Sequence, residues 1–451
     1  MEGSRVIQAV FLLGVLAGML VLLISQELVP KQPDPATAQF ERIKDFTQAH
    51  FVRELSDQEL VDRALHGMID GLDPYSRYYD QRDGERVRRE TEGDFKGIGV
   101  IFRRPTERGQ VLFPLVGTPA WEAGLRVGDT FVSIDGEPLD GLDEASFREH
   151  LRAAGKSKLV VHVRALDGVE REVELRPRVL LDPTVRHETL VGDAGAIGYL
   201  CIRSFSHRTA EEFDAATERL IARGARALII DVRNNYGGVL DAAVDIARRF
   251  VREGTIVSSE GRAEQVVHSA IPDAARYAAL PTVILVDGDS ASASEVLAGA
   301  LQDHRVAVVV GEPTYGKGML QTIRTFPTFG TRAKVTSAYY YSPSKRNFER
   351  TADEGRDWGI LPDLHVPVDD LTRARVSSYL TRYDPPAELL EDLRELEDHE
   401  GVALLSAAPE DPQLAAAIKL FSGERPGPNV AIEVALGEDQ AAPPPSPARD
   451  K

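Results

Sequence analysis

The spacing of apolar residues divides the chain into stretches of different kinds. Over residues 37–68 apolar side chains recur at roughly helical intervals, which predicts helix, and Ser56 with Glu59 forms a capping signature inside that stretch. The turn-forming run 71–76 ends this pattern. Short strands with turn signals follow, predicted at residues 100–102, 110–114, 130–134 and 158–164, with a tight turn at Asp135 and Gly136 and a helix at 143–153.

From residue 196 onward, continuous apolar strands alternate with amphipathic helices. Strands are predicted at 196–205, 227–232, 282–286 and 306–310, and helices at 209–223, 240–252 and 292–303. This alternation indicates an α/β layer with largely parallel strands. Two strands in hairpin fashion, at 320–326 and 333–341, come next, and residues 388–400 are helical and acidic.

The amino-terminal run 6–24 is nearly all apolar and uncharged, with Arg5 on its amino side. About nineteen such residues in a helix just span a bilayer core. We therefore expect an uncleaved single-pass signal anchor, with the bulk of the protein outside the cytoplasm on the periplasmic side. A cleaved signal peptide and a secreted protein are the alternative, although no Ala-x-Ala site follows closely. Gly14 and Gly18 form a small-xxx-small pair, which leaves a homo-oligomer open.

Composition limits the classes of partner and cofactor. The chain has 451 residues, 43% of them apolar, enough for roughly three domains. The net charge of −18 and the lack of a basic stripe argue against a nucleic-acid partner. Cys201 is the single cysteine, which excludes an internal disulfide and a thiolate metal cluster, and its apolar neighbours indicate a core thiol. No metal and no cofactor are expected.

Ser292 lies between an apolar strand and a helix. A serine at such a turn projects its hydroxyl beside the unpaired N–H groups of the helix start, which can hold a developing oxyanion. The alternative is that the three hydroxyl residues Ser290, Ser292 and Ser294 simply cap the helix.

A nucleophilic serine also needs a base. No histidine stands in a recognisable triad setting, and His304, next to Asp303, is the only candidate. Lys317 follows a buried strand between Gly316 and Gly318, and burial would favour its neutral amine. The same stretch matches part of a phosphate-binding loop, but Gly318 replaces the required Ser or Thr and a strand follows instead of a helix.

Three segments together resemble the carboxy-terminal processing peptidases, also called tail-specific proteases. They are residues 290–295, residues 311–318 with Gln321, and the run Asp-Val-Arg-Asn-Asn-Tyr-Gly-Gly at 231–238, and the likeness covers roughly residues 37–370. The resemblance implies that Ser292 is the acylating nucleophile and Lys317 its general base. It further implies that Gln321 orients the lysine, that the N–H groups of Gly238 and Ala293 form the oxyanion hole, and that Asp303 has a supporting place.

The chain departs from the family pattern at two places. Tyr236 stands where the family commonly has Pro before the glycine pair, and the stretch 344–358 is longer and more charged than usual. Both bear on substrate specificity rather than on the chemistry.

Residues 95–178 resemble a bacterial PDZ domain. Gly97, Ile98, Gly99 and Val100 stand where such domains have the carboxylate-binding loop, and residues 118–136 carry the helix and hairpin. The resemblance implies β-augmentation, in which a peptide end adds a strand to a sheet edge and N–H groups capture its terminal carboxylate. A PDZ fold that serves only as a spacer is the alternative.

The expected organisation is α/β and multidomain. It comprises a transmembrane signal-anchor helix with flanks (1–28), a linker and helical segment (29–94), a PDZ domain (95–180), a serine peptidase core resembling the crotonase and Clp-protease type (181–370) and an acidic extension with a disordered Pro-rich tail (371–451). The resemblance implies a Ser-Lys serine endopeptidase that cleaves proteins near apolar C-termini. A catalytically inactive, membrane-anchored PDZ adaptor is the alternative.

Overall fold

The computed structural model describes residues 34–81, 83, 92–103, 109–139, 147, 151, 157–192, 195–262, 264–350, 358–404 and 408–422. The predicted anchor 6–24, most of the predicted helix 143–153 and the Pro-rich tail lie outside these residues. Across the described part of the chain, no helix is long and apolar enough to cross a membrane. The chain divides into two units, Met1–Pro74 and Tyr75–Lys451.

Residues 34–74 of the first unit, which the structure describes, form the helices α2 (Pro35–His50) and α3 (Asp57–Ile69), where the sequence predicted one helical stretch. The interruption falls at the capping signature. Ser56 accepts a hydrogen bond from the Glu59 N–H and donates its own N–H to the Glu59 carboxylate, each over 3.2 Å. Such a capping box satisfies the N–H groups of a helix start, so it marks the beginning of a second helix.

The second unit begins with a small, mainly antiparallel domain. Its described elements are β2 (Asp94–Gly97), β3 (Val100–Phe102), β4 (Val111–Pro114), α5 (Pro119–Glu122), β5 (Thr130–Ile134), β6 (Glu137–Pro138), β7 (Leu159–Arg164), β8 (Glu170–Leu175) and β9 (Arg178–Leu181). The strands predicted at 100–102 and 130–134 are confirmed. The sequence missed β8, whose exposed positions carry Glu170, Glu172 and Glu174, because a strand with so few apolar residues gives a weak signal.

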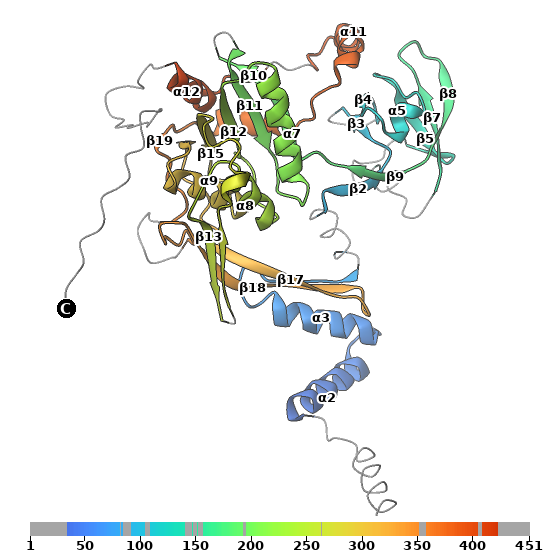
Figure 1. Cartoon of the computed structure of the whole chain (residues 1–451). Helices are drawn as coiled ribbons and strands as arrows, with labels where there is room; N and C mark the ends of the chain where they lie inside the picture. The colour runs from blue at the N-terminus through green and yellow to red at the C-terminus, as the bar shows by residue number, and fades with distance from the viewer. Residues whose placement is uncertain are drawn as a thin grey trace, which may run out of the picture. The chain divides into compact units, whose positions relative to one another are not determined.

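The larger domain is built on a six-stranded sheet in the order β10-β11-β12-β15-β16-β19 (Figure 1). The strands are β10 (Val185–Val191), β11 (Ile197–Ile202), β12 (Ala227–Asp231), β15 (Thr282–Val286), β16 (Val308–Gly311) and β19 (Leu364–His365). All neighbouring strands are parallel except β10 and β11. The predicted α/β layer is therefore confirmed.

Successive residues of the central strands point to opposite faces, and helices cover both. On one face Leu200, Ile230 and Ile284 pack with the helices α7 (Thr209–Ala222), α8 (Leu240–Arg248) and α9 (Ala293–Asp303). On the other face Ile229 and Leu285 pack with α10 (Asp370–Leu380) and α12 (Pro412–Phe421). Burial on both faces explains why these strands read as unbroken apolar runs.

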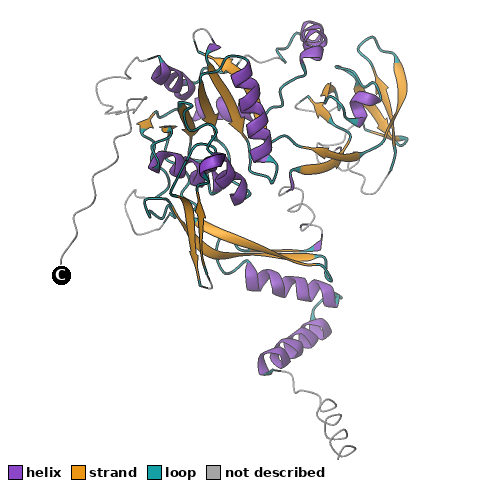
Figure 2. Cartoon of the chain, viewed as in Figure 1, coloured by secondary structure: helices purple, strands orange, loops and turns teal. Residues whose placement is uncertain are grey.

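A second sheet joins strands that are distant in the sequence. It contains β1 (Arg77–Tyr79), β13 (Thr255–Gly261), β14 (Gln265–Ser269), β17 (Met319–Phe326) and β18 (Thr331–Tyr341). Figure 2 shows β17 and β18 as a long two-stranded ribbon, as the predicted hairpin requires. The sequence missed β14, whose side chains are mostly exposed.

The carboxy-terminal part contributes helices to two places. α11 (Leu390–Glu400) buries Leu393 and Leu396 against Phe113 and Val127 of the small domain, which confirms the predicted acidic helix. α12 packs on the sheet of the larger domain through Ala417. The 371–451 segment is thus partly a structural component of the second unit.

Candidate active site

Ser292 is the N-cap residue of α9, where the chain leaves the carboxyl end of β15. Its side chain is nearly buried, and its φ of 58° lies in the left-handed region, which non-glycine residues rarely occupy. Strain of this kind persists only where the surrounding structure holds it, and it is commonest at functional sites. The strand-to-helix turn predicted for Ser292 is therefore present.

The neighbouring serines have structural partners. Ser290 Oγ donates to the Val232 carbonyl and Ser294 Oγ donates to the Asn235 carbonyl, each over 2.8 Å. Both bonds tie the Ser292 segment to the loop that follows β12. The idea that all three serines only cap the helix is therefore wrong for Ser290 and Ser294.

Glu295 is a fully buried carboxylate that the sequence reasoning did not single out. Its Oε1 accepts hydrogen bonds from Thr314 Oγ1 (2.6 Å) and the Gly316 N–H (2.7 Å), and its Oε2 accepts from the N–H groups of Ser292 and Lys317 (2.8 Å each). Burial raises the pKa of Glu295, while the hydrogen bonds that it accepts act in the opposite direction. The Ser-x-x-Glu pattern at 292–295, a helix-start signature, was the available signal.

Lys317 is partly buried, and its Nζ lies 5.0 Å from the centroid of the Tyr75 ring. The pKa of this amine is lowered to about 8, chiefly by burial and in addition by the charge of Lys334, whereas Glu295 and Glu349 act to raise it. Roughly a fifth of such an amine is neutral near physiological pH, far more than of an ordinary lysine, and the neutral form is the one that a general base requires. No described hydrogen bond joins Lys317 Nζ to Ser292 Oγ; catalytic hydrogen bonds often form only with substrate bound.

The glycines beside Lys317 permit close packing. Gly316 has a φ of 84°, and a Cβ there would lie 2.7 Å from the Trp358 ring. The Gly318 N–H donates to the Glu349 carboxylate over 2.7 Å, and the Arg350 N–H donates to the Gly316 carbonyl over 2.9 Å. The charged segment after β18 thus forms one wall of the Lys317 site. A strand, β17, follows Lys317, which excludes the geometry of a phosphate-binding loop.

The glycine pair after β12 lies directly against the start of α9. A Cβ on Gly237 would lie 2.9 Å from Ser292 Cβ and 3.0 Å from the Ala293 nitrogen, and Gly238, at a φ of 142°, packs on the Phe205 carbonyl. Within the described residues, neither the Gly238 N–H nor the Ala293 N–H has an acceptor. Two unpaired donors beside a serine hydroxyl are what oxyanion binding requires.

Of two other predicted residues, Gln321 has a different partner from the one expected, whereas Asp303 makes a supporting contact. Gln321 Nε2 donates to the Met319 carbonyl over 3.0 Å, at a bulge between Leu320 and Gln321, and no described bond connects it to Lys317. Asp303 accepts the Ser344 N–H over 2.9 Å, which is a supporting contact between α9 and the segment after β18.

The histidines closest to a triad pattern are engaged elsewhere. His304 lies at the opposite end of α9 from Ser292, and its Nε2 bonds the Thr255 carbonyl at 2.7 Å. His187 contacts Asp384 through Nδ1 (2.7 Å) and the Leu380 carbonyl through Nε2 (3.2 Å), so both ring nitrogens are occupied. Neither ring is placed to take a proton from Ser292.

The predicted carboxylate loop lies between β2 and β3. Ile98 is buried in the core of the small domain, and its carbonyl accepts the Ala120 N–H of α5 over 2.9 Å. Gly99 has a φ of 78°, and a Cβ there would collide with the Thr118 side chain. Gly97 pairs with Arg178, and Val100 begins β3. Glycine is therefore needed where this loop approaches the helix.

Comparison with known proteins identifies the families of both domains. Residues 196–366 match peptidase family S41, and residues 114–164 match the PDZ domain. The carboxyl-terminal-processing protease of Synechocystis is 33% identical over 334 residues, which are 72% of this chain and 75% of the relative. The carboxyl-terminal-processing protease of Picosynechococcus is 32% identical over 342 residues, which are 73% of this chain and 79% of that relative. A solved photosystem II D1 C-terminal processing protease covers 74% of this chain and 90% of its own, with 27% identity and a TM-score of 0.41.

The α/β core and the serine at its strand-to-helix turn define a serine peptidase joined to a PDZ domain. The chain belongs to the carboxyl-terminal-processing protease family of serine peptidases. The expected family, enzyme class and protein or peptide substrates are thereby confirmed.

Proposed function

We propose that this protein is a membrane-tethered serine endopeptidase in which Ser292 is the nucleophile and Lys317 the general base. One observation carries the proposal: a single buried carboxylate, Glu295, accepts the backbone N–H groups of both residues. That arrangement fixes the turn with the serine and the loop with the lysine in one frame, as a two-residue catalytic unit requires.

The proposed reaction is acyl transfer. The neutral Lys317 amine takes the proton of Ser292 Oγ as that oxygen attacks the scissile carbonyl, and the N–H groups of Gly238 and Ala293 donate to the oxyanion. The Lys317 ammonium returns the proton to the leaving amine, and water then hydrolyses the acyl-enzyme. Gln321, on β17 beyond the lysine, would orient the amine once substrate is bound.

The PDZ domain is proposed to select substrates by their apolar carboxyl termini. The loop of Gly97, Ile98, Gly99 and Val100 follows β2 and leads into β3, which suits capture of a terminal carboxylate by backbone N–H groups. A tail bound there would be delivered to the peptidase as an extended strand.

The run 6–24 is proposed to anchor the protein in the membrane, with the peptidase on the periplasmic side. Membrane fractionation, together with the mass of the mature protein, tests this point. A soluble protein that lacks the first residues would show a secreted enzyme instead.

Tail recognition is tested with two peptides of identical sequence that end in apolar residues, one with a free carboxylate and one amidated. The free acid should inhibit cleavage of an unstructured protein at least about tenfold better, because amidation removes the charge that the loop would hold. Equal inhibition by the two peptides would exclude carboxylate capture. Binding of the free acid without any cleavage of the protein substrate would indicate the inactive adaptor.

A further inference from the structure

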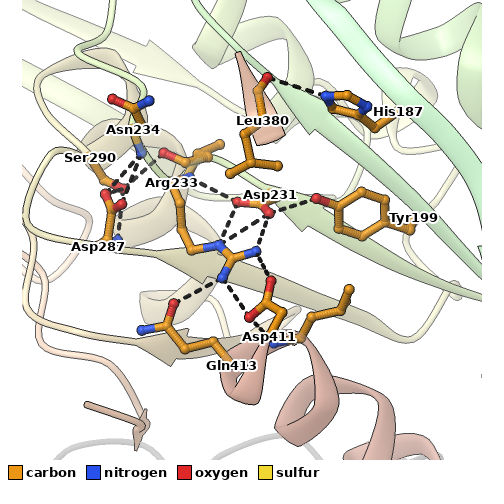
Figure 3. Close-up of polar contacts among 12 residues, drawn as sticks. His187, Tyr199, Asp231, Arg233, Asn234, Asp287, Ser290, Leu380, Asp411 and Gln413 are labelled. Atoms are coloured by element: carbon orange, nitrogen blue, oxygen red, sulfur yellow. Dashed lines mark hydrogen bonds and ion pairs between the residues drawn. The ribbon is translucent and has the colours of Figure 1, made fainter. Parts of the chain in front are cut away.

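A buried polar network joins the end of β12 to neighbouring strands (Figure 3). Asp231 and Arg233 are fully buried. The Asp231 carboxylate accepts the Tyr199 hydroxyl (2.7 Å), the Arg233 N–H (2.9 Å) and the Arg233 guanidinium, with Nη2 to Oδ2 at 2.6 Å. A cation buried to this degree needs an acceptor for each donor.

The remaining acceptors of Arg233 come from the start of α12, far along the chain. Arg233 Nη1 donates to Asp411 (2.9 Å) and to Gln413 (3.0 Å), and Nη2 donates to Asp411 (2.7 Å). Asp411 also caps α12 by accepting the Leu414 N–H over 3.0 Å. Burial alone would raise the pKa of Asp411, but the Arg233 charge holds that pKa below its usual value.

Short hydrogen bonds connect the residues after Arg233 to the segments that carry the proposed oxyanion donors. The Asn234 N–H donates to Asp287 over 2.9 Å, and the Gly237 N–H donates to Asn235 Oδ1 over 2.9 Å. The Asn235 carbonyl accepts the Ala291 N–H, immediately before Ser292, over 3.0 Å. A displacement of Arg233 would therefore be passed to the glycine pair and to the turn that holds the serine.

We infer that α12 acts through Arg233 to hold the 233–238 loop, which makes Arg233 and Asp411 positioning residues of the peptidase. This inference rests on the proposed function, because the rate that it affects is that of the Ser292 reaction. It assigns a role in catalysis to the carboxy-terminal extension, which lies beyond the segment that matches the peptidase family.

The test is Asp411→Asn in the full chain, which keeps the size of the side chain but removes the charge that faces Arg233. We expect kcat for an unstructured substrate to fall by about 10- to 100-fold, with KM changed less than about threefold, because misplaced oxyanion donors weaken transition-state binding only. Hydrogen exchange of the 232–239 segment should become faster, since the bonds of the Arg233, Asn234 and Gly237 N–H groups loosen.

Asp214→Asn is the matched control. The Asp214 side chain is 12% exposed, against 11% for Asp411, and it pairs with Arg249 and Arg276 away from the loop. Loss of general stability would affect both variants alike, whereas the inferred role affects kcat and loop exchange only in Asp411→Asn. Gln413→Ala, which removes one hydrogen bond to Arg233, should lower kcat and speed loop exchange to a smaller extent. It replaces Asp411→Asn as the test variant if Asp411→Asn does not fold.

The outcomes separate this inference from the proposed function. Unchanged exchange in 232–239, or faster exchange with unchanged kcat, would overturn the positioning role. If Ser292→Ala retained turnover, the proposed function would fall, while the exchange measurement would still report whether α12 holds the loop.

Discussion

The backbone N–H groups of Ser292 and Lys317 donate to the same oxygen of Glu295, each over 2.8 Å. The two residues belong to α9 and to the loop after β16, which follow different strands of the parallel sheet. Glu295 thus links the backbones of the two residues, as a direct hydrogen bond would link their side chains during the reaction. The rate should therefore depend on these two bonds to Glu295.

Glu295→Gln should therefore reduce kcat by about 100-fold. An amide has one acceptor oxygen, so its NH₂ group must face two of the four donors that now point at the carboxylate. Unsatisfied buried donors should also lower the free energy of unfolding by roughly 2 to 4 kcal/mol. Steady-state kinetics and chemical denaturation measure the two effects. Glu188→Gln, which weakens the pairs of Glu188 with Arg219 and Arg223, is the control, and an equal loss of kcat there would contradict the role of Glu295.

Gly237→Ala should abolish activity, whereas Gly224→Ala should leave it intact. Both glycines have φ near 100°, so both substitutions cost about 1 to 2 kcal/mol of backbone strain. Only at Gly237 does the new methyl group meet other atoms, 2.7 Å from the Ala291 carbonyl and 2.9 Å from Ser292 Cβ. Thermal melts and turnover of the two variants test the comparison, and full activity of Gly237→Ala would show that this contact is dispensable.

The activity should rise with pH, with a midpoint near pH 8, and level off about one pH unit higher. Because burial lowers the pKa of Lys317 to about 8, the amine gains a proton below that pH and can no longer act as a base. Lys334→Gln removes a charge that lowers the pKa of Lys317, so the midpoint of the rise should move to higher pH. The measurement is kcat/KM against pH for both proteins. Lys158→Gln, in a pair with Glu174 on the PDZ domain, should not move the midpoint.

Thiol reagents should leave the native protein unmodified and active. Cys201 is the only cysteine in the sequence and is fully buried on β11, and burial raises the pKa of its thiol. Mass spectrometry after treatment with iodoacetamide should detect no adduct until the protein is unfolded. Inactivation that tracks with native alkylation would contradict the assignment of Cys201 as a core residue.

The sequence predicted the central sheet better than its surroundings. Strands such as Thr282–Val286 are buried at every position and apolar at all but the first, because helices cover both faces of the sheet, and this signal is local in the sequence. Helix breaks and polar strands were harder to predict. A single capping box divides α2 from α3, and β8 carries charged residues on its exposed face. The family resemblance supplied the residue roles, and the structure added the contacts between them.

Long-range polar contacts lay beyond the reach of sequence reasoning. The partnership of Arg233 with Asp411 joins the loop after β12 to the carboxy-terminal extension, 178 residues further along the chain, and no pattern in either neighbourhood signals the other. Glu295 was visible only as a helix-start residue, because its bonds to Gly316 and Lys317 depend on how two strands pack. Burial, which makes both contacts strong, is a property of the assembled fold.

The most direct measurement is turnover of an unstructured protein with an apolar tail by wild type, Ser292→Ala, Lys317→Ala and His304→Ala. The Ser-Lys mechanism predicts that the first two variants lose at least about a thousandfold in kcat while folding normally. His304→Ala should remain active, because His304 lies at the far end of α9 and bonds the Thr255 carbonyl. Unchanged turnover in Ser292→Ala or Lys317→Ala, or loss of turnover in His304→Ala alone, would contradict the account.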